Sequence, residues 1–211
     1  MQIEKQHIVN WLALCARTFD ENQQFLTDLD RDLGDSDHGV NLNRGFKIVA
    51  ENLPLVEKQN IATILKNTGM TLHSNVGGAS GPLYGTLFVR AAATVGTREQ
   101  LSFDQLIDSL KNGVDGIVSR GKAGVGEKTM CDVWLPVLEA AKAQLAAGSP
   151  VETALDKMVE TAEKGVVATI EMQALKGRAS YLGERSIGHQ DPGATSSLMM
   201  IKTLAQVLKS H

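Results

Sequence analysis

Apolar residues recur at every third or fourth position along most of this 211-residue chain. The first such stripe holds Ile8, Leu12, Cys15 and Phe19. Stripes of this period are typical of amphipathic helices that pack on a common core. No stretch alternates Val, Ile and Thr as a half-buried strand does. The pattern therefore predicts eight helices and no strand, with the helices at about 4–26, 40–52, 59–75, 82–95, from 102 onward, 129–147, 155–170 and 198–208.

The connections between these predicted helices differ in length. Most are short, which favours an all-α fold of eight antiparallel helices in a single domain spanning 1–211. Three are longer and rich in glycine and polar residues, namely 28–39, 119–129 and 174–193. Long loops in compact helical domains are more often functional than idle, although 119–129 taken alone also fits a flexible surface connector.

Composition narrows the class of protein. The chain is 43% hydrophobic but only 4% aromatic, so its core must consist chiefly of Leu, Val, Ile, Ala and Met. A formal net charge of −3 gives no electrostatic reason to expect nucleic-acid binding. No apolar run has membrane-spanning length, and the first residues lack the order of a signal peptide. Cys15 and Cys131 lie in apolar segments, which favours buried thiols and a cytoplasmic location.

The loop at 28–39 carries the densest charge in the sequence, with five carboxylates and one arginine. Carboxylates at this density repel one another unless a cation joins them, and Mg²⁺ and Ca²⁺ prefer oxygen ligands. The spacing does not fit an EF-hand, because Phe46 stands where its final glutamate would be. The sequence predicts a magnesium site formed by Asp30, Asp35 and Asp37, and the alternative is a solvated acidic loop.

A second glycine-rich segment follows at 77–82 (Gly-Gly-Ala-Ser-Gly-Pro). Ser80 is expected to cap a new helix, and Pro82 suits its first turn. The exposed N–H groups of such a helix start bind phosphate, whereas the competing explanation is close helix packing. A carboxylate loop together with a phosphate-sized seat suggests a site for a magnesium-bound nucleotide.

Other polar residues are candidates only in this context. His38 adjoins the carboxylates and could contact a phosphate or sugar, or be structural. Asn41 could contact ligand or cap a helix. Arg178 stands in a long loop and could offer its guanidinium fork to phosphate oxygens. Met130 could meet a flat purine or belong to the core. No serine lies beside a histidine and an acid, so a hydrolase triad is rejected.

Four segments together resemble one family, the nucleotide-binding L subunit of dihydroxyacetone kinase. They are 34–39 (Gly-Asp-Ser-Asp-His-Gly), 77–82, 128–132 (Lys-Thr-Met-Cys-Asp) and 177–193, which ends Gly-His-Gln-Asp-Pro-Gly. The resemblance runs essentially from end to end, and the chain shows no departure at these positions. It implies a barrel of eight antiparallel helices with the nucleotide at one end.

The resemblance also implies roles for individual residues. Asp30, Asp35 and Asp37 would bind Mg²⁺, usually as a pair of ions bridging the phosphates. The residues near the phosphates and ribose would be His38, Gly39, Val40, Asn41, Ala79, Ser80 and Arg178. The residues framing the base would be Gly121, Met130, Asp191, Pro192 and Gly193. No general base is expected on this chain, and Arg178 is the one candidate for stabilising the transferred phosphate.

Family resemblance further implies partners. In one branch the L region is fused to a substrate-binding K domain and uses ATP. In the other it is a separate subunit that keeps ADP as a cofactor, rephosphorylated by a phosphohistidine on an M subunit, and passes the phosphoryl group to dihydroxyacetone on a K subunit. A chain of this length has no room for a K domain, which favours the second branch. We also expect a homodimer. The alternatives are an ATP-dependent L subunit, a nucleotide sensor without catalysis, and a helical Ca²⁺-binding protein.

Overall fold

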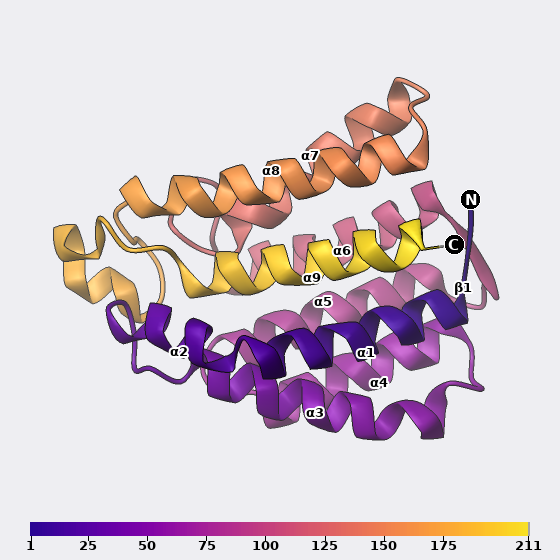
Figure 1. Cartoon of the computed structure of the whole chain (residues 1–211), viewed down its shortest axis with the longest axis horizontal. Helices are drawn as coiled ribbons and strands as arrows, with labels where there is room; N and C mark the ends of the chain where they lie inside the picture. The colour runs from indigo at the N-terminus through magenta and orange to yellow at the C-terminus, as the bar shows by residue number, and fades with distance from the viewer. Residues whose placement is uncertain (211) are drawn as a thin grey trace.

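The computed structural model describes residues 1–210, and most of them are helical (Figure 1). The prediction of an all-α fold is therefore confirmed. The elements are α1 (Lys5–Glu21), α2 (Gln23–Arg31), α3 (His38–Val56), α4 (Ile61–Asn75), α5 (Ser80–Val95), α6 (Phe103–Gly121), α7 (Cys131–Ala146), α8 (Val151–Glu171), the 3-10 helix η1 (Arg178–Ser186), α9 (Pro192–Lys209) and two short strands.

The long helices pack in sequence order. Helix α3 packs on α4, α4 on α5, and each later helix on the next as far as α9, which in turn packs against α1. Helix α1 also packs against α3, and the short α2 lies against α3 and α9. The residues before α1 and the end of α9 lie at the right of Figure 1, whereas α2 and η1 lie at the left. Segments far apart in the sequence therefore meet at that left end.

The predicted first helix, 4–26, is wrong as a single element. The chain leaves helical geometry at Asn22, where φ is −110° and ψ is 13°, and α2 begins at the next residue. The Asn22 side chain donates a hydrogen bond to the Thr18 carbonyl at 2.8 Å, which closes the end of α1. Asparagine competes for backbone partners in this way, and that explains the break. Helix α2 then extends to Arg31, so Asp28 and Asp30 are helical rather than part of a loop.

The prediction that the chain contains no strand is also wrong. Strand β1 (Gln2–Glu4) pairs antiparallel with β2 (Gln100–Ser102), with Ile3 opposite Leu101. Both of these apolar side chains are buried. Strands of three residues are too short to show an alternating pattern, so periodicity could not reveal them.

The capping residues at the N-termini of α6 and α5 can be compared with the sequence. Ser102 caps α6, the helix predicted from residue 102 onward. Its Oγ accepts from Gln105 N at 3.2 Å, while Gln105 Oε1 accepts from Ser102 N at 2.9 Å. The cap predicted at Ser80 is wrong by one residue, because Ala79 occupies the cap position and Ser80 begins α5. The Ser80 hydroxyl instead contacts His38.

The core has the predicted aliphatic character, with a few large rings at its centre. Trp11, Phe19, Phe46 and Phe88 are fully buried. The rings of Phe19 and Phe46 lie 4.8 Å apart between centroids, and those of Trp11 and Phe88 lie 5.7 Å apart. Cys15 and Cys131 are buried free thiols, as expected. Between residues 1 and 210 no helix combines the length and apolar character needed to cross a membrane.

Candidate functional site

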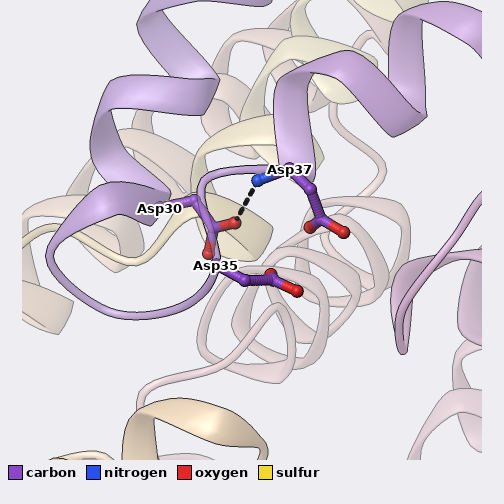
Figure 2. A group of neighbouring side chains, drawn as sticks. All are labelled: Asp30, Asp35 and Asp37. Carbon is purple, nitrogen blue, oxygen red and sulfur yellow. Dashed lines mark hydrogen bonds between the residues drawn. The ribbon is translucent and has the colours of Figure 1, made fainter.

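Three carboxylates meet where α2 passes into α3. Asp30 belongs to the last turn of α2, Asp35 to the connecting turn, and Asp37 to the cap position of α3. Each offers a carboxylate oxygen within 4.8 Å of the others, and Figure 2 shows the three side chains next to one another. The sequence predicted this convergence, and the oxygen-only donor set suits Mg²⁺ or Ca²⁺.

The turn is shaped around Asp30. One oxygen of this carboxylate accepts from Asp37 N at 2.9 Å, drawn as a dashed line in Figure 2, and from His38 N at 3.2 Å. These bonds satisfy the first N–H groups of α3, as an N-cap does. Any side chain at Gly34 would collide with Asp30, because its Cβ would lie 2.2 Å from Oδ1. Glycine at position 34 is thus a condition for the cluster.

The three carboxylates of the cluster still repel one another in the folded chain. Burial and the neighbouring carboxylates of Asp35 and Asp30 raise the pKa of Asp37 above its usual range. Arg178, at the start of η1, forms an ion pair with Asp35. A divalent cation among these three oxygens would remove the remaining repulsion, so the residues present fit the predicted magnesium site.

A cavity of about 250 Å³ opens beside the cluster. The first residues of four helices line it, namely His38 of α3, Ser80 of α5, Cys131 of α7 and Pro192 of α9. Helix N-termini carry a partial positive charge, and their N–H groups bind anions where no side chain already accepts from them. Here Asp30 accepts from His38 N and Asp191 accepts from Ala194 N. Four of them at one cavity, next to a carboxylate cluster, form a site suited to an anion that also carries a cation.

Most of the predicted site residues line this cavity. They are Asp30, Asp35, Asp37, His38, Ala79, Ser80, Gly121, Met130, Arg178, Asp191, Pro192 and Gly193. They come from segments up to 163 positions apart (193 − 30) and meet at the end where α2 and η1 lie in Figure 1. The fold thus assembles one site from the four motif segments.

Three predicted residues do not line the cavity. Gly39 packs against α2, where a Cβ would lie 2.0 Å from the carbonyl oxygen of Gln23. Val40 is partly exposed on α3. Asn41 is buried, accepts a hydrogen bond from Arg44 at 2.8 Å, and lies directly beside Gly77. Asn41 therefore supports the wall of the cavity from behind.

The phosphate-sized seat lies at the start of α5. Gly78 has a φ of +65°, which L side chains rarely adopt, and it turns the chain into the helix. Gly81 approaches α4 so closely that a Cβ would lie 2.1 Å from the Val76 carbonyl oxygen. Gly81 therefore confirms the close-packing explanation for this segment. The start of α5 faces the cavity, where phosphate binding stays a prediction.

His38 is neutral and buried between two helices. Its Nδ1 lies 3.1 Å from Ser80 Oγ, and its Nε2 lies 3.0 Å from Ser196 Oγ. Burial lowers the pKa of His38 to about 4, against the opposing effects of the Asp30 carboxylate and the Pro192 carbonyl. At neutral pH the ring therefore acts as a hydrogen-bonding link and not as a cation.

The opposite wall is formed by Met130 and the start of α9. The Asp191 carboxylate caps α9 by accepting from Ala194 N at 2.7 Å. Burial raises the pKa of Asp191 to about 7, although the Ala194 N–H and the Lys128 ammonium oppose the shift. Met130 is 5% exposed, belongs to the core and also lines the cavity. The core explanation is thus confirmed, and contact with a purine stays a prediction.

Lys128 also lines the cavity, although the sequence indicated it only as the first residue of the 128–132 segment. It is 1% exposed, and its ammonium donates to the carbonyls of Thr169 and His189. Burial lowers the pKa of Lys128, while Asp191, Asp132 and Glu171 oppose that shift. A lysine in a glycine-rich polar loop looks exposed, so the sequence offered no signal of its burial.

Known proteins resemble this chain over nearly its whole length. A model of the DAK2 domain matches residues 32–206. The chain is 52% identical, over 99% of its length and all of the relative's, to the Escherichia coli protein named PEP-dependent dihydroxyacetone kinase, ADP-binding subunit DhaL. It is 42% identical, over 95% of its length and 96% of the relative's, to the Lactococcus lactis protein named PTS-dependent dihydroxyacetone kinase, ADP-binding subunit DhaL.

A solved structure with the same fold is the dihydroxyacetone kinase from C. freundii in complex with AMP-PNP and Mg²⁺. The TM-score is 0.72 at 26% sequence identity, and the match covers 94% of this chain. The chain spans 33% of that larger protein.

Proposed function

We propose that this chain, a member of the DAK2-domain family, binds ADP with Mg²⁺ in the cavity at the start of α3, α5, α7 and α9. Within the family it belongs to the ADP-binding subunits of PEP-dependent dihydroxyacetone kinase. It is thus a phosphotransferase subunit. A separate donor phosphorylates the bound nucleotide, which then phosphorylates dihydroxyacetone on another subunit. The single observation that carries the proposal is the meeting of four helix N-termini with a carboxylate cluster at one cavity.

We propose separate roles for the residues that bind the metal, the phosphates and the base. Asp30, Asp35 and Asp37 would hold two Mg²⁺ ions between themselves and the phosphates. Ala79, Ser80 and Arg178 would hold phosphate oxygens through backbone N–H groups and a guanidinium. The remaining proposed contacts are His38 at the phosphates and ribose, and Gly121, Met130, Asp191, Pro192 and Gly193 around the base. Gly39, Val40 and Asn41 do not line the cavity, so we do not propose them as ligand contacts.

Phosphoryl transfer needs positioning and charge neutralisation more than a nucleophile on the enzyme. When bound, Mg²⁺ would supply the neutralising charge, and ADP would accept a phosphoryl group from the donor to give the ATP that passes it on. This chain contributes the fixed donors around them. We assign no general base here, because activation of dihydroxyacetone would belong to the K subunit.

The proposal extends to architecture and partners. A single domain in the form of an eight-helix barrel is supported by one continuous hydrophobic core and by the contact of α9 with α1. The relatives are named as ADP-binding subunits, which supports an assembly with at least one further subunit. We propose that the partners are a dihydroxyacetone-binding K subunit and an M subunit that donates a phosphohistidine, as the family resemblance implies. Homodimer formation, a cytoplasmic location and the absence of nucleic-acid and membrane partners stay predictions.

The test asks whether the nucleotide is a cofactor. Protein purified in Mg²⁺ should release about one ADP per chain on heating, and chelation should release it without heat, since the ions separate carboxylates from phosphates. With a K subunit present, a phosphohistidine donor should drive repeated turnovers while added ATP alone drives few. Rapid exchange of labelled ADP with turnover on ATP alone would instead favour an ATP-dependent subunit. Slow exchange without transfer would favour a sensor.

A further inference from the structure

Five polar side chains form one hydrogen-bonded group that begins at the cavity wall and extends into the core, called here the Tyr84 network. Ser80 Oγ lies 3.1 Å from His38 Nδ1, and His38 Nε2 lies 3.0 Å from Ser196 Oγ. Ser196 Oγ lies 2.6 Å from the Tyr84 hydroxyl, which also lies 2.9 Å from Ser197 Oγ. The group therefore runs without a gap from the cavity rim into the core.

The Tyr84 network joins three helices near their N-termini. His38 begins α3, Ser80 and Tyr84 stand one turn apart at the start of α5, and Ser196 and Ser197 lie in the second turn of α9. Tyr84 and both α9 serines are fully buried. The three helix starts are thus held together by polar contacts in addition to apolar packing.

The two ends of the network reach opposite walls of the cavity. Ser80 and His38 line the wall beside the carboxylate cluster. At the other end, the Tyr84 hydroxyl donates to the Gly193 carbonyl at 3.2 Å, and Gly193 lines the wall formed by the start of α9. Tyr84 itself does not line the cavity. A ligand spanning both walls would contact groups whose spacing this hydroxyl fixes.

Buried networks of this kind transmit local changes. Each member stays stable only while it keeps a partner, so the loss of one hydroxyl forces the next group to find another or remain unsatisfied. Loss of the Tyr84 hydroxyl would leave Ser196 free to turn away from His38 toward the Gly193 carbonyl, which it already approaches at 3.1 Å. His38 and Ser80 would then lose a fixed orientation.

We propose that Tyr84 is a positioning residue for the nucleotide, which it does not touch. Through Ser196 and His38 it orients Ser80 at the phosphate end, and through Gly193 it fixes the start of α9 at the base end. This inference rests on the proposed function, because it assumes that one nucleotide contacts both walls.

The experiment compares Tyr84→Phe with Thr203→Val. Phenylalanine keeps the ring and removes only the hydroxyl. Thr203 offers a matched control, because it also lies buried on α9 and its hydroxyl bonds to Met200 O and Cys15 Sγ, outside the Tyr84 network. Dissociation of a fluorescent N-methylanthraniloyl ADP is followed in Mg²⁺ after adding excess unlabelled ADP. Tyr84→Phe should dissociate about tenfold faster than the wild type, and Thr203→Val less than about twofold faster.

A double-mutant cycle separates positioning from general loosening. Ser80→Ala should raise the dissociation rate in the wild type and add little in Tyr84→Phe, because both changes break the same chain of contacts. The ¹⁵N signals of the His38 ring in the ligand-free protein should move in Tyr84→Phe and stay in place in Thr203→Val. A merely structural role would give additive rates and unchanged His38 signals.

Ser196→Ala provides a second route to the same result, since it removes the link between Tyr84 and His38 and should also speed dissociation. Wild-type rates in both Tyr84→Phe and Ser196→Ala would overturn the inference and leave the proposed function intact. Failure of the wild type to bind the ADP probe in Mg²⁺ would instead overturn the proposed function, and the inference with it.

Discussion

Lys128 is a charged residue held inside the fold by main-chain oxygens. Its ammonium joins the end of α8, at the Thr169 carbonyl, to the His189 carbonyl just before α9. The Thr169 carbonyl also accepts a hydrogen bond from Met172 N at 3.3 Å. This lysine therefore ties the loop that carries Asp191 to the rest of the domain.

Replacing Lys128 by methionine should destabilise the protein by about 2 kcal/mol, because buried carbonyls would lose their donor. Lys176→Met is the matched control. Lys176 also lines the cavity, but its partner Glu127 is 3.6 Å away and its side chain is 34% exposed, so this change should cost less than about 1 kcal/mol. Urea unfolding of both variants measures the difference, and equal costs would refute a bridging role for Lys128.

Cys15 should make the stability of the protein depend on alkaline pH. Burial raises the pKa of its thiol from an ordinary value near 9 to about 12, although the hydrogen bond with Thr203 opposes the shift. Above pH 9 the unfolded chain loses this proton while the folded chain keeps it, so stability falls as the pH rises. Between pH 9 and 10.5 the wild type should lose about 1.5 kcal/mol more than Cys15→Ala. Parallel pH profiles in urea unfolding would contradict the buried-thiol explanation.

At the scale of elements, the contact between α4 and α5 depends on paired glycines. A Cβ at Gly69 would lie 2.7 Å from the Gly85 carbonyl oxygen, and a Cβ at Gly85 would lie 2.9 Å from the Gly69 carbonyl oxygen. Neither backbone can yield without moving its helix. The start of α5 lines the cavity, so this close approach also sets the position of Ser80.

Gly69→Ala should cost about 2 kcal/mol through overpacking, even though alanine is the better helix former. Gly124→Ala serves as the control, because a Cβ there meets nothing within 4 Å, and its effect should stay within about 0.5 kcal/mol. Urea unfolding measures the free energy of unfolding of both variants, and an unchanged m-value shows that the two-state analysis applies to each. A neutral or stabilising Gly69→Ala would show that α5 can shift away from α4 without cost.

The whole molecule should respond to Mg²⁺ and ADP through its folding equilibrium. A ligand that binds only the folded state adds about 4 kcal/mol at a thousandfold excess over its dissociation constant, which raises the melting temperature of a domain this size by about 10 °C. Asp37→Asn should abolish most of that rise by removing a cation ligand. In chelator, the same variant should melt no lower than the wild type, because the three carboxylates repel one another there.

Asp28→Asn is the control for this experiment. Asp28 belongs to the same acidic stretch, but it is exposed and paired with Arg31 outside the carboxylate cluster. It should keep the full rise in melting temperature. A rise that survives in Asp37→Asn would remove Asp37 from the proposed cation site.

Much of this protein could be predicted from the sequence because its signals are local. The helical period identified the long elements, since each amphipathic stripe reports its own buried face. Asp30, Asp35 and Asp37 were predictable for the same reason, because residues within eight positions of one another cannot separate far in space. The glycine-rich start of α5 was also visible, although the structure moves its cap from Ser80 to Ala79.

The tertiary structure decided what depends on contacts between distant segments. The pairing of Gln2–Glu4 with Gln100–Ser102 joins residues about a hundred positions apart and leaves no periodic trace. Which residues after Asp37 face the cavity depended on where α2 and the Gly77 segment pack. The burial of Lys128 arises where its loop meets the end of α8 and the segment before α9. The Tyr84 network arises where the starts of α3, α5 and α9 meet. A sequence pattern records which side of a helix is apolar, whereas the partner for a buried polar group is set only when the helices pack.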